Sequence, residues 1–233
     1  MRGLRSSGLL LFCLVAPGAH AKDTWIEARS ENFSLLTDAG KGTAENVLED
    51  LEQLRRLVTQ MLPSQPVASA VPTGIFAFRN EKSMKDFQPL REGKAEDWAA
   101  LFRPTGFRNF IALRADGARE WVRELAFRQY LYLLLSYGKV SYPVWLRSGF
   151  SLFYGNANIA KEFAEVGKMH ERHRRELGEY RAMPLQELFA VTHDSPHYRD
   201  ETRRPLFDAQ AWALVHYLLV GRHPEGGRRS ASS

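Results

Sequence analysis

Residues 125–135 (LAFRQYLYLLL) and residues 142–150 (YPVWLRSGF) are the two stretches that decide the fold of this chain. The first is apolar on nearly every side, which indicates a helix buried inside the protein. Arg128 and Gln129 nevertheless lie in its middle, and a buried charge is costly unless it is paired and hydrogen-bonded. Two interpretations follow. Either Arg128 forms a structural ion pair or reaches water at the helix edge, or the helix lines a polar pocket.

Together, the two stretches resemble the core of the peptidase-MA-like gluzincins, exported bacterial proteins grouped as domain of unknown function 1570. The pattern in that family is H-E-Y-x-H, followed by P-x-W-L-x-E-G-x-A-E-Y. The resemblance places the first ligand histidine at Arg128 and the catalytic glutamate at Gln129. It places the second histidine at Tyr132 and the third ligand, a glutamate, at Ser148, 20 residues after position 128 as in the family. The surrounding frame is kept at Tyr130, Pro143, Trp145, Leu146, Gly149 and Tyr154.

The resemblance extends over nearly all of the chain after residue 21. Residues 25–33 resemble the opening strand of the family, and residues 107–113 resemble its hairpin. Further matches to its C-terminal helices are found at residues 184–191, 193–196 and 209–218. Relatives usually carry a tyrosine, thought to approach the metal, at the position of Asp208. The resemblance therefore implies a gluzincin fold in which positions 128, 129, 132 and 148 surround one concavity.

The departures from the family pattern fall on the residues that carry its chemistry. A catalytic zinc site of this kind takes two imidazoles and a carboxylate and keeps a fourth position for water, from which a glutamate removes a proton. Arg128 stays protonated and cannot bind a cation, and Gln129 cannot act as a base. Tyr132 and Ser148 are poor zinc ligands near neutral pH. We therefore predict no catalytic residue, no metal site and no cofactor, with degenerate site positions at Arg128, Gln129, Tyr132, Ser148 and Asp208.

A guanidinium at position 128 restores a positive charge close to where relatives hold their metal. The acid that we expect to meet it is Asp208, through a charge-assisted hydrogen bond. Glu124, one helical turn before Arg128, is the competing partner because an i, i+4 spacing also suits an ion pair.

The N-terminus predicts export. Arg2 and Arg5 precede the apolar run 8–16, and Ala19-His20-Ala21 gives a small-x-small cleavage pattern. We expect a signal peptide at 1–21, a peptidase-MA-like domain at 22–221 and a disordered tail at 222–233. The run is too short to span a bilayer, so we expect a periplasmic or secreted protein with no transmembrane segment after cleavage. The only cysteine, Cys13, lies in the segment that would be removed.

The periodicity of apolar residues predicts an α+β fold with a strand-rich N-terminal half and a helical C-terminal half. Thr43 is the expected N-cap of a first helix that Pro63 closes. The predicted strands lie on either side of a turn in 25–37, at 71–78, in a hairpin of 98–102 with 109–113, and in a short pair at 158–166. The predicted helices cover a short segment around 84–87 and residues 118–136, 143–154, 169–178, 184–191 and 206–220.

Charge and histidine spacing exclude several other functions. The net charge of +5 falls to +3 without Arg2 and Arg5, and the basic run 172–175 is flanked by acids, which is typical of a solvated helix face and not of a nucleic-acid site. The chain has no GxSxG motif of a serine hydrolase. His170 and His173 could share a helix face, but neither they nor His193 and His197 have an acid at metallopeptidase spacing. His216 is expected to pack between helices.

Three functional interpretations stay open from the sequence. The leading one is an exported, catalytically inactive pseudopeptidase with a binding or scaffold role, whose partner is a peptide or an envelope protein. The second is a hydrolase with residual or non-zinc activity. The third is a truncated fragment of a longer relative, because many relatives continue into helical repeats. The sequence predicts no nucleic-acid partner and leaves the oligomeric state undetermined.

Overall fold

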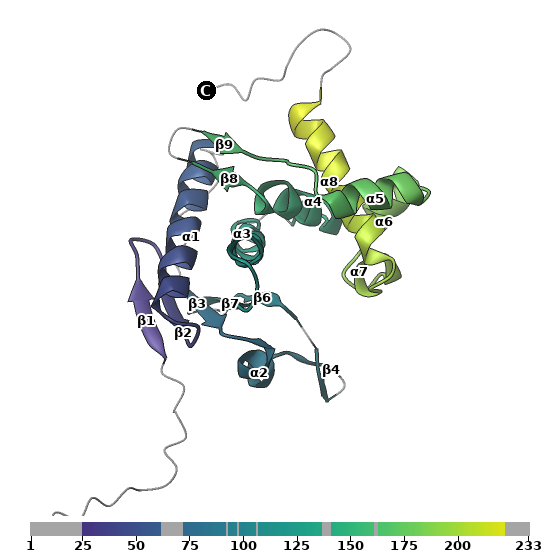
Figure 1. The fold of residues 1–233 in the computed structure, drawn as a ribbon. Helices are drawn as coiled ribbons and strands as arrows, with labels where there is room; N and C mark the ends of the chain where they lie inside the picture. Colours follow the sequence, from purple (N-terminus) through teal and green to yellow (C-terminus); the bar gives the residue numbers. More distant parts are fainter. Residues whose placement is uncertain are drawn as a thin grey trace, which may run out of the picture.

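A computed structural model describes residues 25–61, 72–91, 93–96, 98–105, 107–136, 141–160 and 163–221. The predicted signal peptide 1–21 and the predicted tail 222–233 lie outside the described residues. The described chain folds into a mixed sheet with two long helices on it, followed by a group of C-terminal helices (Figure 1). The α+β class, with most strands in the first half and mainly helices in the second, is confirmed.

The main sheet has five strands in the order β1-β2-β3-β7-β6. β1 pairs antiparallel with β2 across the predicted turn, and β6 pairs antiparallel with β7 as the predicted hairpin. Parallel pairing joins β2 to β3 and β3 to β7. The strands are β1 (Ile26–Arg29), β2 (Ser34–Thr37), β3 (Thr73–Phe78), β6 (Ala100–Arg103) and β7 (Asn109–Arg114).

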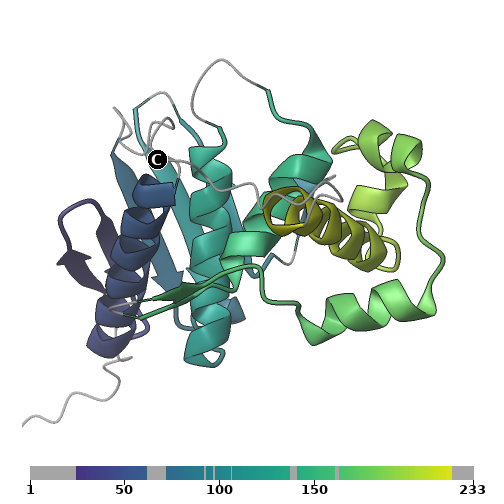
Figure 2. The same cartoon turned by 90° about the horizontal axis from the view of Figure 1, so that it is seen from above.

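The two faces of the sheet carry different cores because successive residues of a strand point to opposite sides. Helices α1 (Lys41–Met61) and α3 (Arg119–Leu134) cover one face, where Ile75 of β3 joins the main apolar core (Figure 2). Phe78 of β3 joins a smaller core with Met84 at the end of α2 (Glu81–Met84). The 3-10 helix η1 (Lys85–Phe87) follows α2, and the short strands β4 (Leu90–Arg91) and β5 (Lys94–Ala95) form a second sheet.

The start of α1 corrects one prediction. The helix begins at Lys41, so Thr43 lies inside its first turn and does not cap it. The Thr43 hydroxyl donates a hydrogen bond to the Ala39 carbonyl at 3.1 Å. Threonine at this position satisfies its own hydroxyl against the backbone one turn earlier, a pattern that the sequence does not distinguish from a cap.

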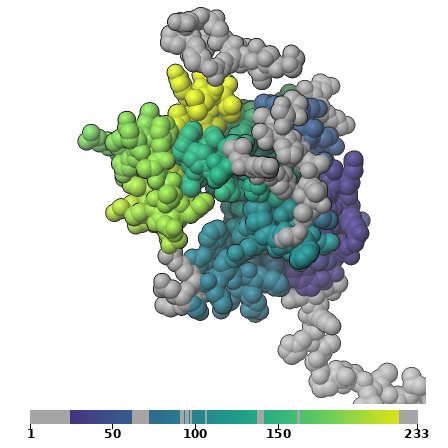
Figure 3. Space-filling view, turned by 180° about the vertical axis from the view of Figure 1, so that it is seen from behind, coloured from purple at the N-terminus to yellow at the C-terminus, as the bar shows by residue number. Residues whose placement is uncertain are grey.

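The second half is helical, as predicted. Its helices are α4 (Val144–Gly155), α5 (Glu171–Glu179), α6 (Leu185–Ala190), α7 (Pro196–Arg199) and α8 (Arg204–Val220). The predicted strand pair is present as β8 (Asn158–Ile159) and β9 (Ala164–Glu165). The single-turn helix α7 was not predicted. Seen from behind, the surface is hollowed between the strands and these C-terminal helices (Figure 3). Within the described ranges, no helix has the length and apolar character needed to cross a membrane.

Helix α4 packs closely against both α3 and α8, and two of its glycines permit this. A Cβ atom at Gly149 would lie 2.3 Å from the carbonyl oxygen of Ala211 on α8. A Cβ atom at Gly155 would lie 2.6 Å from Cγ of Arg128 on α3. Both contacts are far shorter than van der Waals distances, so the α3–α4–α8 arrangement requires glycine at these positions.

We predict that Gly149→Ala lowers the free energy of unfolding by about 3 kcal/mol, because the new methyl group meets the α8 backbone, which cannot rotate away. Gly178→Ala on α5 is the matched control, since nothing lies within 4 Å of its added Cβ. That control is expected to stabilise the protein by about 0.5–1 kcal/mol through the better helix propensity of alanine. Urea unfolding of both variants measures this, and equal effects would contradict the close α4–α8 crossing.

Candidate functional site

Arg128 lies where α3, α4 and α8 come together, and it pairs with the acid on its own helix. Its Nη1 lies 3.9 Å from Oε1 of Glu124, one turn earlier on α3, and its side chain is 22% exposed. Its aliphatic stem passes over Gly155 of α4. Its Nε is buried without a hydrogen-bond partner. The structure therefore agrees with parts of both interpretations: Arg128 forms an ion pair with Glu124, and its helix lines a polar pocket.

The predicted hydrogen bond between Arg128 and Asp208 is wrong. Asp208 instead pairs with Arg204, one turn earlier on α8, with 3.5 Å between Arg204 Nε and Asp208 Oδ2. Its other oxygen, Oδ1, is buried without a hydrogen-bond partner. Each charge meets the opposite charge four residues away because i, i+4 side chains are neighbours on a helix, whereas a cross-helix pair depends on how the helices pack. The competing partner, Glu124, is the observed one.

Asp208 still acts on Arg128 through its charge. Burial alone lowers the pKa of Arg128, but the nearby Tyr132, Asp208 and Glu124 outweigh it, and the net pKa lies above its ordinary value despite opposition from Arg204. Arg128 is therefore a permanent cation in this site.

Tyr132 belongs to the same cluster but faces different neighbours. The guanidinium carbon of Arg147 lies 5.7 Å from the centre of the Tyr132 ring, and the Tyr132 hydroxyl is buried without a hydrogen-bond partner. Burial is the main cause that raises the pKa of Tyr198, and the charge of Tyr132 raises it further. The guanidinium carbon of Arg204 lies over the Tyr198 ring, 4.2 Å from its centre. Tyr132 of α3 is thus close enough to Tyr198 of α7 and Arg204 of α8 to affect their pKa values.

The remaining two predicted positions are less closely tied to this cluster. Ser148 of α4 is 1% exposed, and its hydroxyl is buried without a hydrogen-bond partner. Gln129 is half-buried on α3. A cavity of about 690 Å³ opens beside the cluster, and it is lined by Arg128 and Asp208 but not by Gln129, Tyr132 or Ser148. The structure therefore brings Arg128, Tyr132 and Asp208 together and does not place all the predicted positions on one cavity wall.

His173 of α5 is a site residue that the sequence pointed to only through its spacing from His170. It lines the cavity and is 8% exposed, and its Nδ1 is buried without a hydrogen-bond partner. Its ring centre lies 5.7 Å from that of Trp212 and 5.9 Å from that of His170. The predicted packing of His216 between helices is confirmed, because its ring on α8 lies 5.8 Å from the ring of Phe153 on α4. The i, i+3 spacing of His170 and His173 was the only sequence signal for this stack.

Burial has a strong effect on the protonation of His173. It lowers the pKa of this imidazole from 6.5 to about 4, and the effect of Asp208, which favours the charged form, is smaller. His170, Arg128 and Arg172 add to the lowering. His173 is thus neutral at neutral pH and offers one donor and one acceptor nitrogen.

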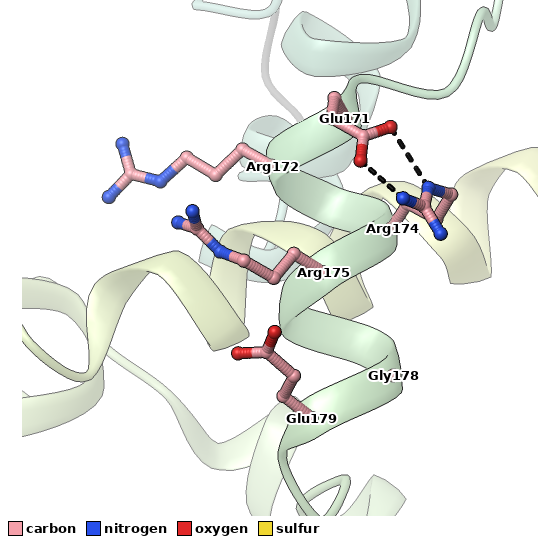
Figure 4. Close-up of a pocket in the computed structure, with 6 residues that line it drawn as sticks. All are labelled: Glu171, Arg172, Arg174, Arg175, Gly178 and Glu179. Atoms are coloured by element: carbon pink, nitrogen blue, oxygen red, sulfur yellow. Dashed lines mark hydrogen bonds and ion pairs between the residues drawn. The ribbon is translucent and has the colours of Figure 1, made fainter.

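Other candidate residues lie outside the cavity. His197 contacts Glu187, with 2.8 Å between Nε2 and Oε1. Across the ranges that the structure describes, no three or more His, Cys, Asp or Glu side chains are grouped so that they could hold a metal ion. A shallow charged groove of about 530 Å³ runs along α5 (Figure 4), where Arg174 Nε donates to Glu171 at 2.9 Å. Exposure of Arg172, Arg174 and Arg175 confirms the predicted solvated helix face.

The cluster offers guanidinium donors, carboxylate acceptors and a neutral imidazole around one cavity, which are groups suited to binding a polar molecule. No protein-family model matches the chain, and the search of curated proteins finds no match to it.

We predict that His173 makes the protein less stable in acid. Its pKa is 6.5 when unfolded and about 4 when folded, so between these values the unfolded chain binds more protons. The contribution of His173 to the free energy of unfolding is fully present above pH 6.5. About 3 kcal/mol is lost as the pH drops to about 4.

Urea unfolding across this pH range tests the prediction. His173→Phe keeps a ring against Trp212 and should remove this part of the pH dependence. His197→Gln, which changes an imidazole in the exposed contact with Glu187, should keep it. A His173→Phe profile as steep as that of the parent protein would show that His173 is not the responsible group.

Proposed function

We propose that this chain is an exported, catalytically inactive metallopeptidase-like protein, a pseudopeptidase with a gluzincin-like fold that binds or scaffolds a partner in the cell envelope. The observation that carries the proposal is the half-buried Arg128, a permanent cation at the position where relatives hold their first metal ligand. Glu124 and Asp208 both stabilise its charge. A dication placed beside this guanidinium would be repelled, because like charges in a poorly solvated site interact strongly.

The other departures support the same proposal. A tyrosine at position 132 and a serine at position 148 replace a strong imidazole ligand and a carboxylate ligand. Both hydroxyls are buried without a hydrogen-bond partner. The amide of a glutamine at position 129 cannot accept a proton as a general base. Restoring a single residue would thus not restore the chemistry of a zinc peptidase.

We propose a peptide or an envelope protein as the partner. The strand β6 lies at one edge of the main sheet, next to β7, and edge strands can accept an extended peptide through backbone hydrogen bonds. The assignment of the partner class rests on analogy between folds.

Zinc analysis of the purified protein, together with a casein cleavage assay, tests whether the protein lacks zinc-dependent peptidase activity. The proposal expects substoichiometric zinc and no cleavage that a chelator abolishes. One zinc ion per chain or chelator-sensitive cleavage would overturn it. Recovery of one specific partner from envelope extracts, lost when strand β6 is altered by Leu101→Pro, supports the binding role, provided that circular dichroism shows the variant folded.

Repair of the site is the sharper test. We predict that the quadruple variant Arg128→His, Gln129→Glu, Tyr132→His and Ser148→Glu binds zinc, because it restores two imidazoles and a carboxylate. Activity need not return, since the groups that orient metal ligands have an effect of their own. The triple variant that keeps Ser148 is the matched control and should bind zinc at least about tenfold more weakly. A folded quadruple variant that binds no zinc would contradict the proposed ligand positions.

A further inference from the structure

The cavity beside Arg128 holds four buried polar atoms that have no hydrogen-bond partner. They are the atoms Arg128 Nε, Asn156 Oδ1, His173 Nδ1 and Asp208 Oδ1, and all four residues line the cavity of about 690 Å³. That volume lies in the range of small-molecule sites. Buried polar groups are nearly always paired in proteins. A ligand that supplies the missing partners would therefore complete the hydrogen bonding of these atoms.

Three of the four residues have an interaction through another of their polar atoms. The Asn156 amide nitrogen donates to the Lys168 carbonyl at 2.6 Å, which fixes its oxygen as the free acceptor. Asp208 uses Oδ2 with Arg204 and leaves Oδ1 free. Arg128 uses Nη1 with Glu124 and leaves Nε free. Beside the cavity, the residues Arg128, Asn156 and Asp208 therefore leave one donor and two acceptors unpaired, and the His173 nitrogen can serve as either.

The charges around the cavity are balanced. Three arginines and three acids line it: Arg128, Arg172 and Arg204, and Glu124, Glu201 and Asp208. An anion such as phosphate would meet three carboxylates, and a cation would meet three guanidinium groups. A neutral molecule with separated charges matches both sets, because its negative end can accept from the arginine side while its positive end donates to the acid side.

We propose that this cavity binds a small zwitterion that carries both a carboxylate and a primary ammonium, as free α-amino acids and short peptides do. The carboxylate accepts from Arg128, and the ammonium donates to Asp208 and Asn156. The inference rests on the proposed function, because a metal ion at position 128 would exclude this arrangement. It deepens that function by naming the ligand class of the cavity.

Thermal shift and calorimetric titration of the purified protein test the inference. The probes are the twenty common L-amino acids and the dipeptide Ala-Ala at millimolar concentration, each compared with its N-acetylated and C-amidated forms. We expect saturable binding of at least one free zwitterion, and binding at least about tenfold weaker for both capped forms. Tighter binding of a single amino acid or of the dipeptide distinguishes the two sources of this chemistry.

Variants assign the contacts. Asp208→Asn keeps the shape of the side chain and should weaken the zwitterion about tenfold or more, with little change for the N-acetylated probe. Arg128→Gln should weaken the zwitterion and leave the C-amidated probe little changed. Asp194→Asn, in an exposed ion pair with Arg199, is the matched control and should bind like the parent protein.

Three outcomes would overturn the inference: no probe binds the folded protein, the capped forms bind as tightly as the free ones, or inorganic phosphate or acetate binds as tightly as any zwitterion. These results leave the proposed function standing, because that is decided by zinc content and cleavage. Stoichiometric zinc in the native protein would overturn both the proposed function and this inference.

Discussion

The close approach of α4 to both α3 and α8 fixes the geometry around Arg128. Gly149 allows the α8 backbone to touch α4, and Gly155 allows the stem of Arg128 to lie against the end of α4. A side chain at either position would push a helix outward and open the core between them. Because Trp212 and Phe207 of α8 are buried in that region, the helix cannot shift without exposing them. The positions of Arg128 and Asp208 are thus consequences of backbone packing.

This packing decides which charges meet. Arg128 and Asp208 lie close enough to influence each other, yet each bonds to the opposite charge on its own helix. A pair on one helix forms when both side chains adopt suitable rotamers. A pair between two helices also requires that the helices pack with the two residues at the same level along their axes. The consequence is that one atom of each residue, Arg128 Nε and Asp208 Oδ1, stays without a hydrogen-bond partner. A direct Arg128–Asp208 bond would have satisfied both residues and closed this wall.

The sequence predicted the elements well and the contacts between helices less well. Strands and long helices follow from the spacing of apolar residues, which is local information. Helix α7 has four residues, too few to show a period. The role of His173 depends on Trp212 and Asp208, which come from another helix, and no local pattern reports such a contact. Likewise, i, i+4 spacing identified Glu124 as a partner of Arg128, but the resemblance favoured Asp208, whose own i, i+4 partner is Arg204.

The distribution of unsatisfied groups supports the proposal that the cavity binds a polar ligand. In the described part of the chain, every buried polar side-chain atom without a hydrogen-bond partner except Asp38 Oδ2 lies on α3, α5 or α8 or within α4 and its C-cap. Each such atom costs about 1–3 kcal/mol when left unpaired, and replacement by apolar residues would remove that cost. A site that had only lost its metal would gain stability by becoming apolar. This one instead combines charged side chains, a neutral buried imidazole and an open cavity, which are the features that the proposed polar ligand would use.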